Sequence, residues 1–238
     1  MTQPLVACLM PTVMERERFW PRAIRCWRAQ TYEPKVLIIG ITEDPLYLHD
    51  QMLEDTRIHL VRATPGATLG RHRNHTCEAA VALGATIAVH FDDDDWSHPE
   101  RIQEQVAQLQ NSDRHCVGYR CGLFWLEANQ TAWMYSNGLL SYCLGNSLCY
   151  WLEIWQRVKF PELRRGEDWA WLREVDSIGL VPDPPHIIAA VHNGNAANYP
   201  VERDAKISPN WRRAAEWDEM CKREMALSGE IIEGHHAD

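Results

Sequence analysis

Short apolar runs alternate with segments of helical periodicity through the first half of the chain. Four of these runs are rich in residues that favour strands, and they cover residues 5–10, 36–41, 58–61 and 86–91. Phe19, Ala23 and Trp27 recur at helical spacing between the first two runs, and a second helix is predicted over 76–83. Strands that alternate with helices are typical of a mostly parallel sheet flanked by helices. We therefore expect an α/β fold.

The second half of the chain predicts a continuation of the same domain. Its predicted elements are extended runs over 116–135, a loop over 138–145, a helix near 169–175 and an apolar run over 187–191. A chain of 238 residues with 45% hydrophobic content is sufficient for one such core. We assign residues 1–198 to one domain and residues 199–238 to a C-terminal helical extension packed on or near it.

The predicted C-terminal helix opens at Ser208-Pro209, a good cap and first-turn pair, and continues to about residue 227. Trp217, Met220 and Cys221 lie near one face of this helix. Such a face is compatible with a lid over a substrate cleft, a homodimer contact or packing on the core. Core packing is the default interpretation.

The charge and the cysteines restrict the classes of function. With 33 acidic and 24 basic side chains the net charge is -9, which argues against nucleic acid or an anionic membrane as a partner. No secretory signal or apolar run of membrane-spanning length is present, so we expect a cytoplasmic location. None of the eight cysteines forms a CxxC pair, which favours buried, reduced thiols. Core packing explains most of the eleven tryptophans, although one or two could stack on a base or a sugar ring.

Four consecutive aspartates, Asp92 to Asp95, follow the predicted strand at 86–91. Adjacent carboxylates repel one another, so a cation is expected to compensate them. Mg²⁺ and Mn²⁺ prefer oxygen ligands, and one or two carboxylates often hold them together with water and substrate phosphates. Ligands of open α/β sheets gather outside the carboxyl ends of the strands, where this run is expected. A solvated acidic turn that caps the helix opened by Pro99 is the alternative.

Four sequence stretches, including the aspartates, follow one another in an order known from one enzyme family. They are Met10-Pro11-Thr12 with Arg16, Arg22-Ala23-Ile24 and Gln30-Thr31-Tyr32; Leu69-Gly70-Arg71-His72-Arg73-Asn74; the segment from Phe91 to Pro99; and Phe160-Pro161 with Gly166-Glu167-Asp168-Trp169. In these stretches the chain resembles family 2 glycosyltransferases, which are inverting enzymes with a GT-A fold. The resemblance covers roughly residues 4–198. It implies a GT-A-type Rossmann-like sandwich and transfer of a sugar from a nucleoside-diphosphate sugar to an acceptor hydroxyl.

The resemblance also implies a Mn²⁺ or Mg²⁺ site. Asp94 is the implied direct ligand because its spacing to Pro99 matches the metal-binding aspartate of the family. Asp92 would face the ribose or a metal-bound water. His192 resembles a histidine that some GT-A enzymes use as a metal ligand or a diphosphate contact, although a structural role is the alternative.

The donor contacts implied by the resemblance lie in the first three stretches. They are Pro11, Thr12, Arg16, Arg71, Arg73, Asp92 and Asp93. The two arginines of the second stretch are expected just before a helix start, where cationic side chains add to the positive helix terminus that faces phosphate. A solvated loop is the alternative for these arginines.

Asp168 is the implied general base, with Glu167 as the second choice. Inversion by direct displacement needs a carboxylate that takes the proton of the acceptor hydroxyl as its oxygen attacks the anomeric carbon. An acidic pair at a helix start can also serve only the helix dipole. The loop Leu144-Gly145-Asn146-Ser147 is expected where the family binds donor sugar or acceptor.

One stretch departs from the family pattern. Family members usually end their second strand in Asp-Asp-Gly, whereas this chain reads Gly40-Ile41-Thr42-Glu43-Asp44. The donor base therefore stays open among UDP-, dTDP- and GDP-sugars, with Glu43 or Asp44 as substitutes from a shifted loop. The acceptor is not indicated.

Two other functions fit parts of the pattern. A nucleotidyltransferase shares the sheet and an acidic metal site, but the chain lacks a glycine-rich, lysine-containing loop after the first strand. A catalytically silent module that binds nucleotide or carbohydrate would explain the missing second-strand acids. The presence of both Asp94 and the Glu167-Asp168 pair argues against it.

Overall fold

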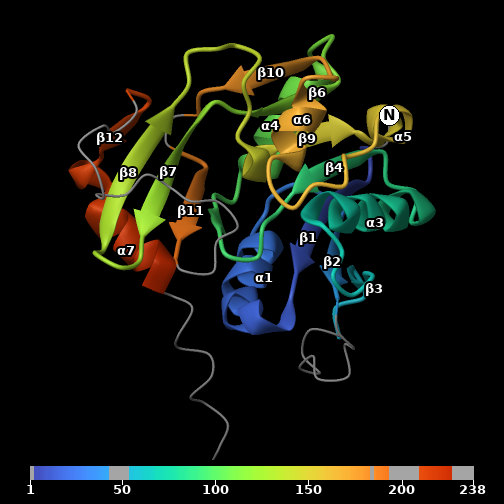
Figure 1. Ribbon diagram of the computed structural model, residues 1–238, viewed down its shortest axis with the longest axis horizontal. Coiled ribbons are helices and arrows are strands. Elements are labelled where there is room, and N and C mark those ends of the chain that lie inside the picture. Colours follow the sequence, from blue (N-terminus) through green and yellow to red (C-terminus); the bar gives the residue numbers. More distant parts are fainter. Residues whose placement is uncertain (1–2, 43–53, 183–184, 193–208, 227–238) are drawn as a thin grey trace, which may run out of the picture.

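Two sheets lie next to each other in the computed structural model, which describes residues 3–42, 54–182, 185–192 and 209–226 (Figure 1). Within these ranges the larger sheet has seven strands in the order β10-β6-β9-β4-β1-β2-β3. Their bounds are β1 Val6–Thr12, β2 Lys35–Ile41, β3 Ile58–Arg62, β4 Ile87–His90, β6 Cys116–Tyr119, β9 Cys149–Trp151 and β10 Ser177–Leu180. Only β9 runs antiparallel to its neighbours, so the described sheet is mostly parallel.

Helices cover both faces of this sheet. Helices α1 (Trp20–Arg28) and α4 (Arg101–Gln110) pack on one face, where their apolar side chains form one core cluster with alternate strand residues. Helices α3 (Leu69–Ala82), α5 (Leu152–Arg157) and α6 (Glu167–Leu172) pack on the other face with the remaining strand residues. Strands buried on both faces must be apolar throughout, which explains the short continuous apolar runs of the sequence.

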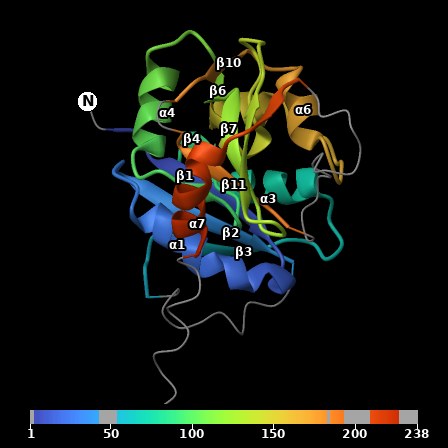
Figure 2. The ribbon, with the colours of Figure 1, turned by 90° about the vertical axis from the view of Figure 1, so that its left-hand side faces the viewer.

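The smaller sheet has the order β12-β8-β7-β11-β5 within the described residues. Its strands are β5 Trp96–Ser97, β7 Cys121–Leu126, β8 Thr131–Ser136, β11 Ile187–Val191 and β12 Trp211–Arg213. Helix α7 (Asp218–Ala226) covers one face of this sheet through Cys221 and Met225. In Figure 2, α7 lies in front of these strands and close to α1. The short segments η1 (Met14–Phe19), η3 (Gly145–Ser147) and η4 (Ala215–Trp217) complete the described elements.

The predicted fold class is confirmed, and two predicted helix starts are wrong. The strand runs of the first half appear as β1 to β4. Helix α3 begins at Leu69 instead of residue 76, because the Thr68 side chain caps it by accepting from Arg71 N. Helix α7 begins only at Asp218, because the segment after Pro209 forms β12 on the edge of β8. The described part of the C-terminal helix packs on the smaller sheet.

The cysteines are free thiols, and seven of the eight are buried. This agrees with the prediction of small buried side chains. Among the described residues, no helix combines the length and the apolar character needed to cross a membrane.

Candidate functional site

The acidic run lies at the carboxyl end of the large sheet. It follows β4, whose parallel neighbour β1 ends at Thr12. The carboxyl ends of parallel strands meet at one edge of a sheet, so residues after β1 can reach the aspartates. Asp93, Asp94 and Asp95 are buried, whereas the side chain of Asp92 is 27% exposed.

Asp93 is held by the segment that follows β1. Thr12 Oγ1 donates to Asp93 Oδ2 over 2.5 Å, and Trp20 Nε1 donates to Thr12 Oγ1 over 2.8 Å. Arg16 makes a two-pronged contact, with Nη2 2.7 Å from Oδ1 and Nε 2.8 Å from Oδ2 of Asp93. Burial raises the pKa of Asp93 to about 6 in spite of these bonds. Asp93 therefore anchors the guanidinium group of Arg16.

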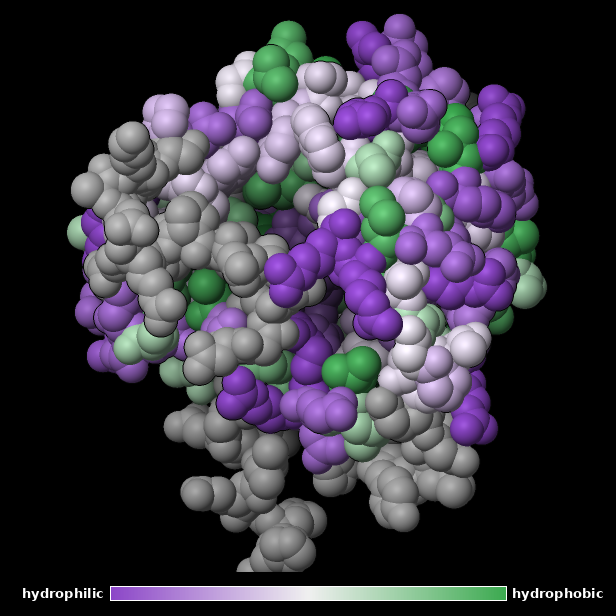
Figure 3. Space-filling view, viewed as in Figure 1, coloured by the Kyte–Doolittle hydropathy of each residue, from purple (hydrophilic) through white to green (hydrophobic). Residues whose placement is uncertain are grey.

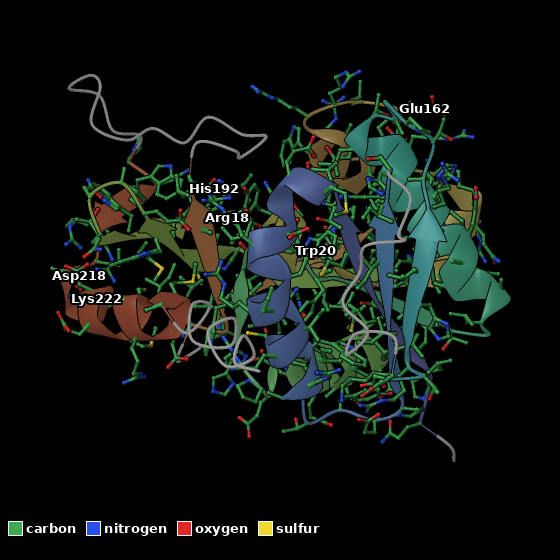
Figure 4. The ribbon with its side chains drawn as sticks, turned by 90° about the horizontal axis from the view of Figure 1, so that it is seen from below. Arg18, Trp20, Glu162, His192, Asp218 and Lys222 are labelled. Carbon is green, nitrogen blue, oxygen red and sulfur yellow. The ribbon has the colours of Figure 1, made fainter. Side chains whose placement is uncertain are left out.

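Asp94 joins Arg16 to His192. Its Oδ2 lies 2.6 Å from Arg16 Nη2 and 3.0 Å from His192 Nε2. His192, which is labelled in Figure 4, follows β11. Its ring centroid is 4.5 Å from that of Phe19 in η1. Burial acts to raise the pKa of Asp94, but the hydrogen bond from His192 and the charge of Arg16 lower it overall. The Asp94 carboxyl is therefore kept ionised.

Asp95 ties the acidic turn to neighbouring loops. Its carboxyl group accepts from Asn146 Nδ2 over 2.7 Å and from Ala190 N over 3.1 Å. Burial, followed by the charges of Asp94 and Asp92, raises the pKa of Asp95 well above its ordinary value. Its surroundings therefore suit a positioning role.

Two buried arginines donate hydrogen bonds to backbone carbonyl groups in and around the acidic turn. Arg22 donates to the carbonyl of Asp94 and, over 3.0 Å, to that of Met225 in α7. Arg101 donates to the carbonyls of His90 and Asn146 over 2.6 and 2.9 Å. Since both side chains are fully buried, their donors stabilise this arrangement of the loops.

Arg73 connects the acidic run to the second acidic pair. Its Nε donates to Glu167 Oε1 over 3.0 Å, and its Nη1 lies 3.5 Å from Asp92 Oδ1. Asp92 Oδ1 is buried and has no hydrogen-bond partner among the described residues. Burial raises the pKa of Glu167, although the charge of Arg73 opposes this effect.

These contacts change the interpretation of the acidic run. The repulsion between adjacent carboxylates predicted a compensating cation, and Arg16 and Arg73 supply positive charge at this place. Repulsion alone is therefore no argument for a metal ion. The buried Oδ1 of Asp92, which accepts no hydrogen bond from the described residues, is the observation that still favours one.

Asp168 lies in the first turn of α6 and faces the loop at η3. Gly166 caps the helix with a φ of 72°, a left-handed conformation that favours glycine. The Asp168 carboxyl lies so close to Gly145 that a Cβ at this glycine would overlap it. Because residue 145 is a glycine, the half-buried Asp168 carboxylate can lie against this loop at the wall of the site.

The segment that carries Glu167 and Asp168 is attached to α3 by Asn74. The Oδ1 of Asn74 accepts from Trp155 Nε1 and Phe160 N, and the Nδ2 of Asn74 donates to Phe160 O. All three distances are 2.9–3.0 Å. Gly70 packs against the Pro161 carbonyl, where a Cβ would overlap it. The second and fourth sequence stretches of the resemblance are therefore in direct contact.

We expect Asn74→Ala to lower the free energy of unfolding by about 3 kcal/mol, because it leaves buried donors and an acceptor without partners. Urea unfolding followed by circular dichroism measures this change. Gln108→Ala, at an exposed position of α4, is the control and should change stability by less than about 0.5 kcal/mol. Equal stability of the Asn74 variant and the wild type would contradict the anchoring role.

A cavity of about 500 Å³ joins these groups. Figure 3 shows the hollow near the middle of this face. Its walls include Pro11, Thr12, Val13, Arg16, Ala67, Leu69, His72, Arg73, Asp92, Asp93, Asp94, Asp95, Phe124, Tyr142, Leu144, Gly145, Asn146, Arg165, Gly166, Glu167, Asp168, Ala189 and Ala190. Residues from all four sequence stretches thus line one cavity.

Two of the predicted site residues are not among those that line the cavity. Arg71 is half-exposed and pairs with Glu162 over 3.0 Å, on the first turn of α3 and not before the helix. His192 contacts the cavity residue Asp94 through its Nε2. Glu43 and Asp44 lie outside the described residues.

Sequence reasoning missed part of the apolar wall of the cavity. Phe124 and Tyr142 contribute to it together with Leu144 of the predicted loop. Phe124 has the sequence context of an ordinary core residue, so only the pairing of β7 with β8 and β11 reveals its place.

Solved structures of TarS from S. aureus, a glycosyltransferase, share the fold. TarS 1–349 in complex with UDP has a TM-score of 0.59 and 15% identity, covering 79% of this chain and 61% of that chain. TarS 1–349 in complex with UDP-GlcNAc has a TM-score of 0.61 and 15% identity, covering 95% of this chain and 66% of that one. In the first comparison the protein thus spans about three fifths of the TarS chain. No family model and no curated protein sequence matches. The protein therefore has a GT-A-type fold, with a mostly parallel central sheet flanked by helices.

Proposed function

We propose that the protein is an inverting family 2 glycosyltransferase that moves a sugar from a nucleoside-diphosphate sugar to an acceptor hydroxyl with the help of Mn²⁺ or Mg²⁺. The observation that carries this proposal is the single cavity lined by the acidic run, Arg73 and Asp168. The TarS structures with UDP and UDP-GlcNAc support a nucleotide-sugar donor on this scaffold.

The donor half of the cavity lies between β1 and the acidic run. Pro11 and Thr12 form its wall, and Arg16 and Arg73 place guanidinium groups beside it. Guanidinium groups bind phosphate oxygens in a two-pronged manner, so these arginines suit the diphosphate of a donor. Asp92 and Asp93 also line this half. Because its Oδ1 accepts no hydrogen bond from the described residues, Asp92 is suited to a ribose hydroxyl or a metal-bound water.

The side chains at Asp94 fit a divalent ion of the open type. Asp94 Oδ2 and His192 Nε2 are 3.0 Å apart, and neighbouring ligands of an octahedral ion with bonds of about 2.1 Å are separated by about 3 Å. No group of three His, Cys, Asp or Glu residues suited to a metal occurs among the described residues, so water and donor phosphates would complete the ligand set. Arg16 competes with the ion for Asp94 Oδ2. When bound, the ion would neutralise negative charge on the departing diphosphate.

Asp168 is suited to act as the base. The acceptor oxygen forms a bond to the anomeric carbon, the bond from this carbon to the phosphate oxygen breaks, and the hydroxyl proton passes to the Asp168 carboxylate. The products are the glycoside and a nucleoside diphosphate. Glu167 is less available for this role because it is buried and paired with Arg73.

A thermal-shift screen with UDP-, dTDP- and GDP-sugars tests donor and metal together. We expect one donor to raise the unfolding temperature by about 5 °C, because binding to the folded state stabilises it, and only when Mn²⁺ or Mg²⁺ is present. Incubation with this donor should release nucleoside diphosphate. Release of pyrophosphate would indicate a nucleotidyltransferase, and protection that does not depend on metal would overturn the metal site.

A further inference from the structure

An aromatic wall lies beside Asp168. We define this wall as Phe124, Tyr135, Tyr142, Trp169 and Trp211. All of these rings except that of Trp169 pack on the face of the smaller sheet that lies opposite to α7. Their centroids are close: 4.7 Å from Phe124 to Trp211, 5.0 Å from Trp211 to Tyr135 and 5.8 Å from Tyr135 to Tyr142.

The wall runs from the cavity to the molecular surface. Phe124 and Tyr142 line the cavity, and the ring of Tyr142 is 5.9 Å from that of Trp169. Trp169 is 48% exposed, and the nearby loop also exposes Leu139 and Leu140, by 60% and 67%. An exposed indole that continues the apolar side of a polar cavity is typical of a ligand-binding surface.

The groups around this indole combine an apolar plane with hydrogen-bond acceptors. Trp169 directly follows Asp168, whose Oδ1 accepts from Trp169 N over 2.8 Å. The rings of Tyr142 and Tyr135 lie further along the wall, and the Tyr135 hydroxyl accepts from Asn137 Nδ2 over 3.3 Å. A pyranose ring has the complementary pattern, since it presents C–H groups on its faces and hydroxyl groups at its edges, and aromatic rings with polar edges suit such ligands.

The position of the wall separates it from the donor contacts. Thr12, Arg16 and Arg73 come from the large sheet and the segments next to it, whereas three rings of the wall come from β7, β8 and β12 of the smaller sheet. Tyr142 lies in the loop after β8, and Trp169 lies in α6. Asp168 and Gly145 lie between these two halves, since both line the cavity and touch each other. A ring that stacks on the wall therefore brings its hydroxyl groups toward Asp168.

We propose that the acceptor is a carbohydrate whose ring stacks on Trp169, with Tyr142 as the second aromatic contact toward the cavity. The role of this carbohydrate as the acceptor rests on the proposed function. The carbohydrate site itself does not depend on that function. Trp169 sets the affinity for the acceptor and makes no contact with the donor.

Saturation-transfer NMR with methyl α- and β-glycosides of glucose, galactose, mannose and N-acetylglucosamine tests the site directly. We expect at least one glycoside to bind the wild-type chain through its ring protons. Trp169→Ala should weaken this binding at least 10-fold, and Trp169→Phe should weaken it less because it keeps an aromatic plane. Leu83→Ala, at another exposed apolar position, is the control and should bind as the wild type does.

The outcomes separate this inference from the proposed function. Failure of all glycosides to bind, or equal binding to wild type and Trp169→Ala, overturns the carbohydrate site. Binding of 1-octanol at Trp169 in place of the glycosides would indicate an apolar ligand and also overturns it. Thermal shifts with the nucleotide sugars and Mn²⁺ are measured on the same variants and should be unchanged in Trp169→Ala. Glycoside binding without any nucleotide-sugar shift would instead refute the proposed transferase and leave the carbohydrate site standing.

Discussion

Asp168→Asn should lower the rate constant of sugar transfer by roughly 100- to 10,000-fold, the usual contribution of a general base. The amide cannot accept the acceptor proton, while its similar shape keeps the packing against Gly145. Binding of the nucleotide sugar should be unchanged, because the donor contacts lie on the other side of the cavity. Transfer is measured as nucleoside-diphosphate release at saturating donor, and donor binding by calorimetry with Mn²⁺.

Glu167→Gln is the matched variant, since it changes the neighbouring acid. Arg73 would lose a buried ionic partner, so this variant should lose about 3 kcal/mol of stability. The variants thus divide the acidic pair into a residue that acts on the substrate and one that holds Arg73. A stable Glu167→Gln protein without transfer, together with an active Asp168→Asn protein, would reverse the two roles.

The sequence predicts the large sheet well because its strands carry a local signal. Each parallel strand is buried on both faces and reads as a short apolar run. The carboxyl end of β4 follows from this pattern, and so does the position of the four aspartates. The order of strands and the antiparallel β9 depend on contacts between distant segments, which a single sequence does not encode locally.

The smaller sheet and its aromatic wall could not be predicted in the same way. Strand β12 has three residues and forms only on the edge of β8, so its segment reads as the start of a helix when taken alone. Phe124 is indistinguishable in sequence from a core residue. Its place beside the cavity follows from the pairing of β7 with β11, in which Phe124 lies opposite Ala189, 65 residues further along the chain.

The partners of the aspartates are the least predictable part of the site. Charge repulsion correctly predicts positive groups near the run, but it does not specify their nature. Arg16 reaches Asp93 and Asp94 because η1 turns back over the end of β1. His192 reaches Asp94 because β11 belongs to the neighbouring sheet.

Asp94→Ala is expected to reduce sugar transfer by about 100- to 1,000-fold, as for the loss of one group that stabilises transition-state charge. Alanine removes the carboxylate that we propose as the metal ligand, while Asp93 still holds Arg16 through two contacts. The guanidinium group therefore stays beside the cavity, and the loss is specific to the metal. Isothermal calorimetry with Mn²⁺ and UDP should show that the metal no longer tightens nucleotide binding.

Asp113→Ala controls for the loss of a carboxylate as such, because the Asp113 side chain is 92% exposed and lies outside the cavity wall. It should retain both transfer and the metal dependence of UDP binding. If Asp94→Ala kept full transfer, or if Mn²⁺ still tightened UDP binding in this variant, Asp94 would not be the ligand. The Asp92→Asn variant then decides between a metal held by the Asp92 carboxylate and neutralisation of the diphosphate by Arg16 and Arg73 alone. In the first case Asp92→Asn abolishes the metal dependence, and in the second the wild type transfers sugar equally well with a chelator present.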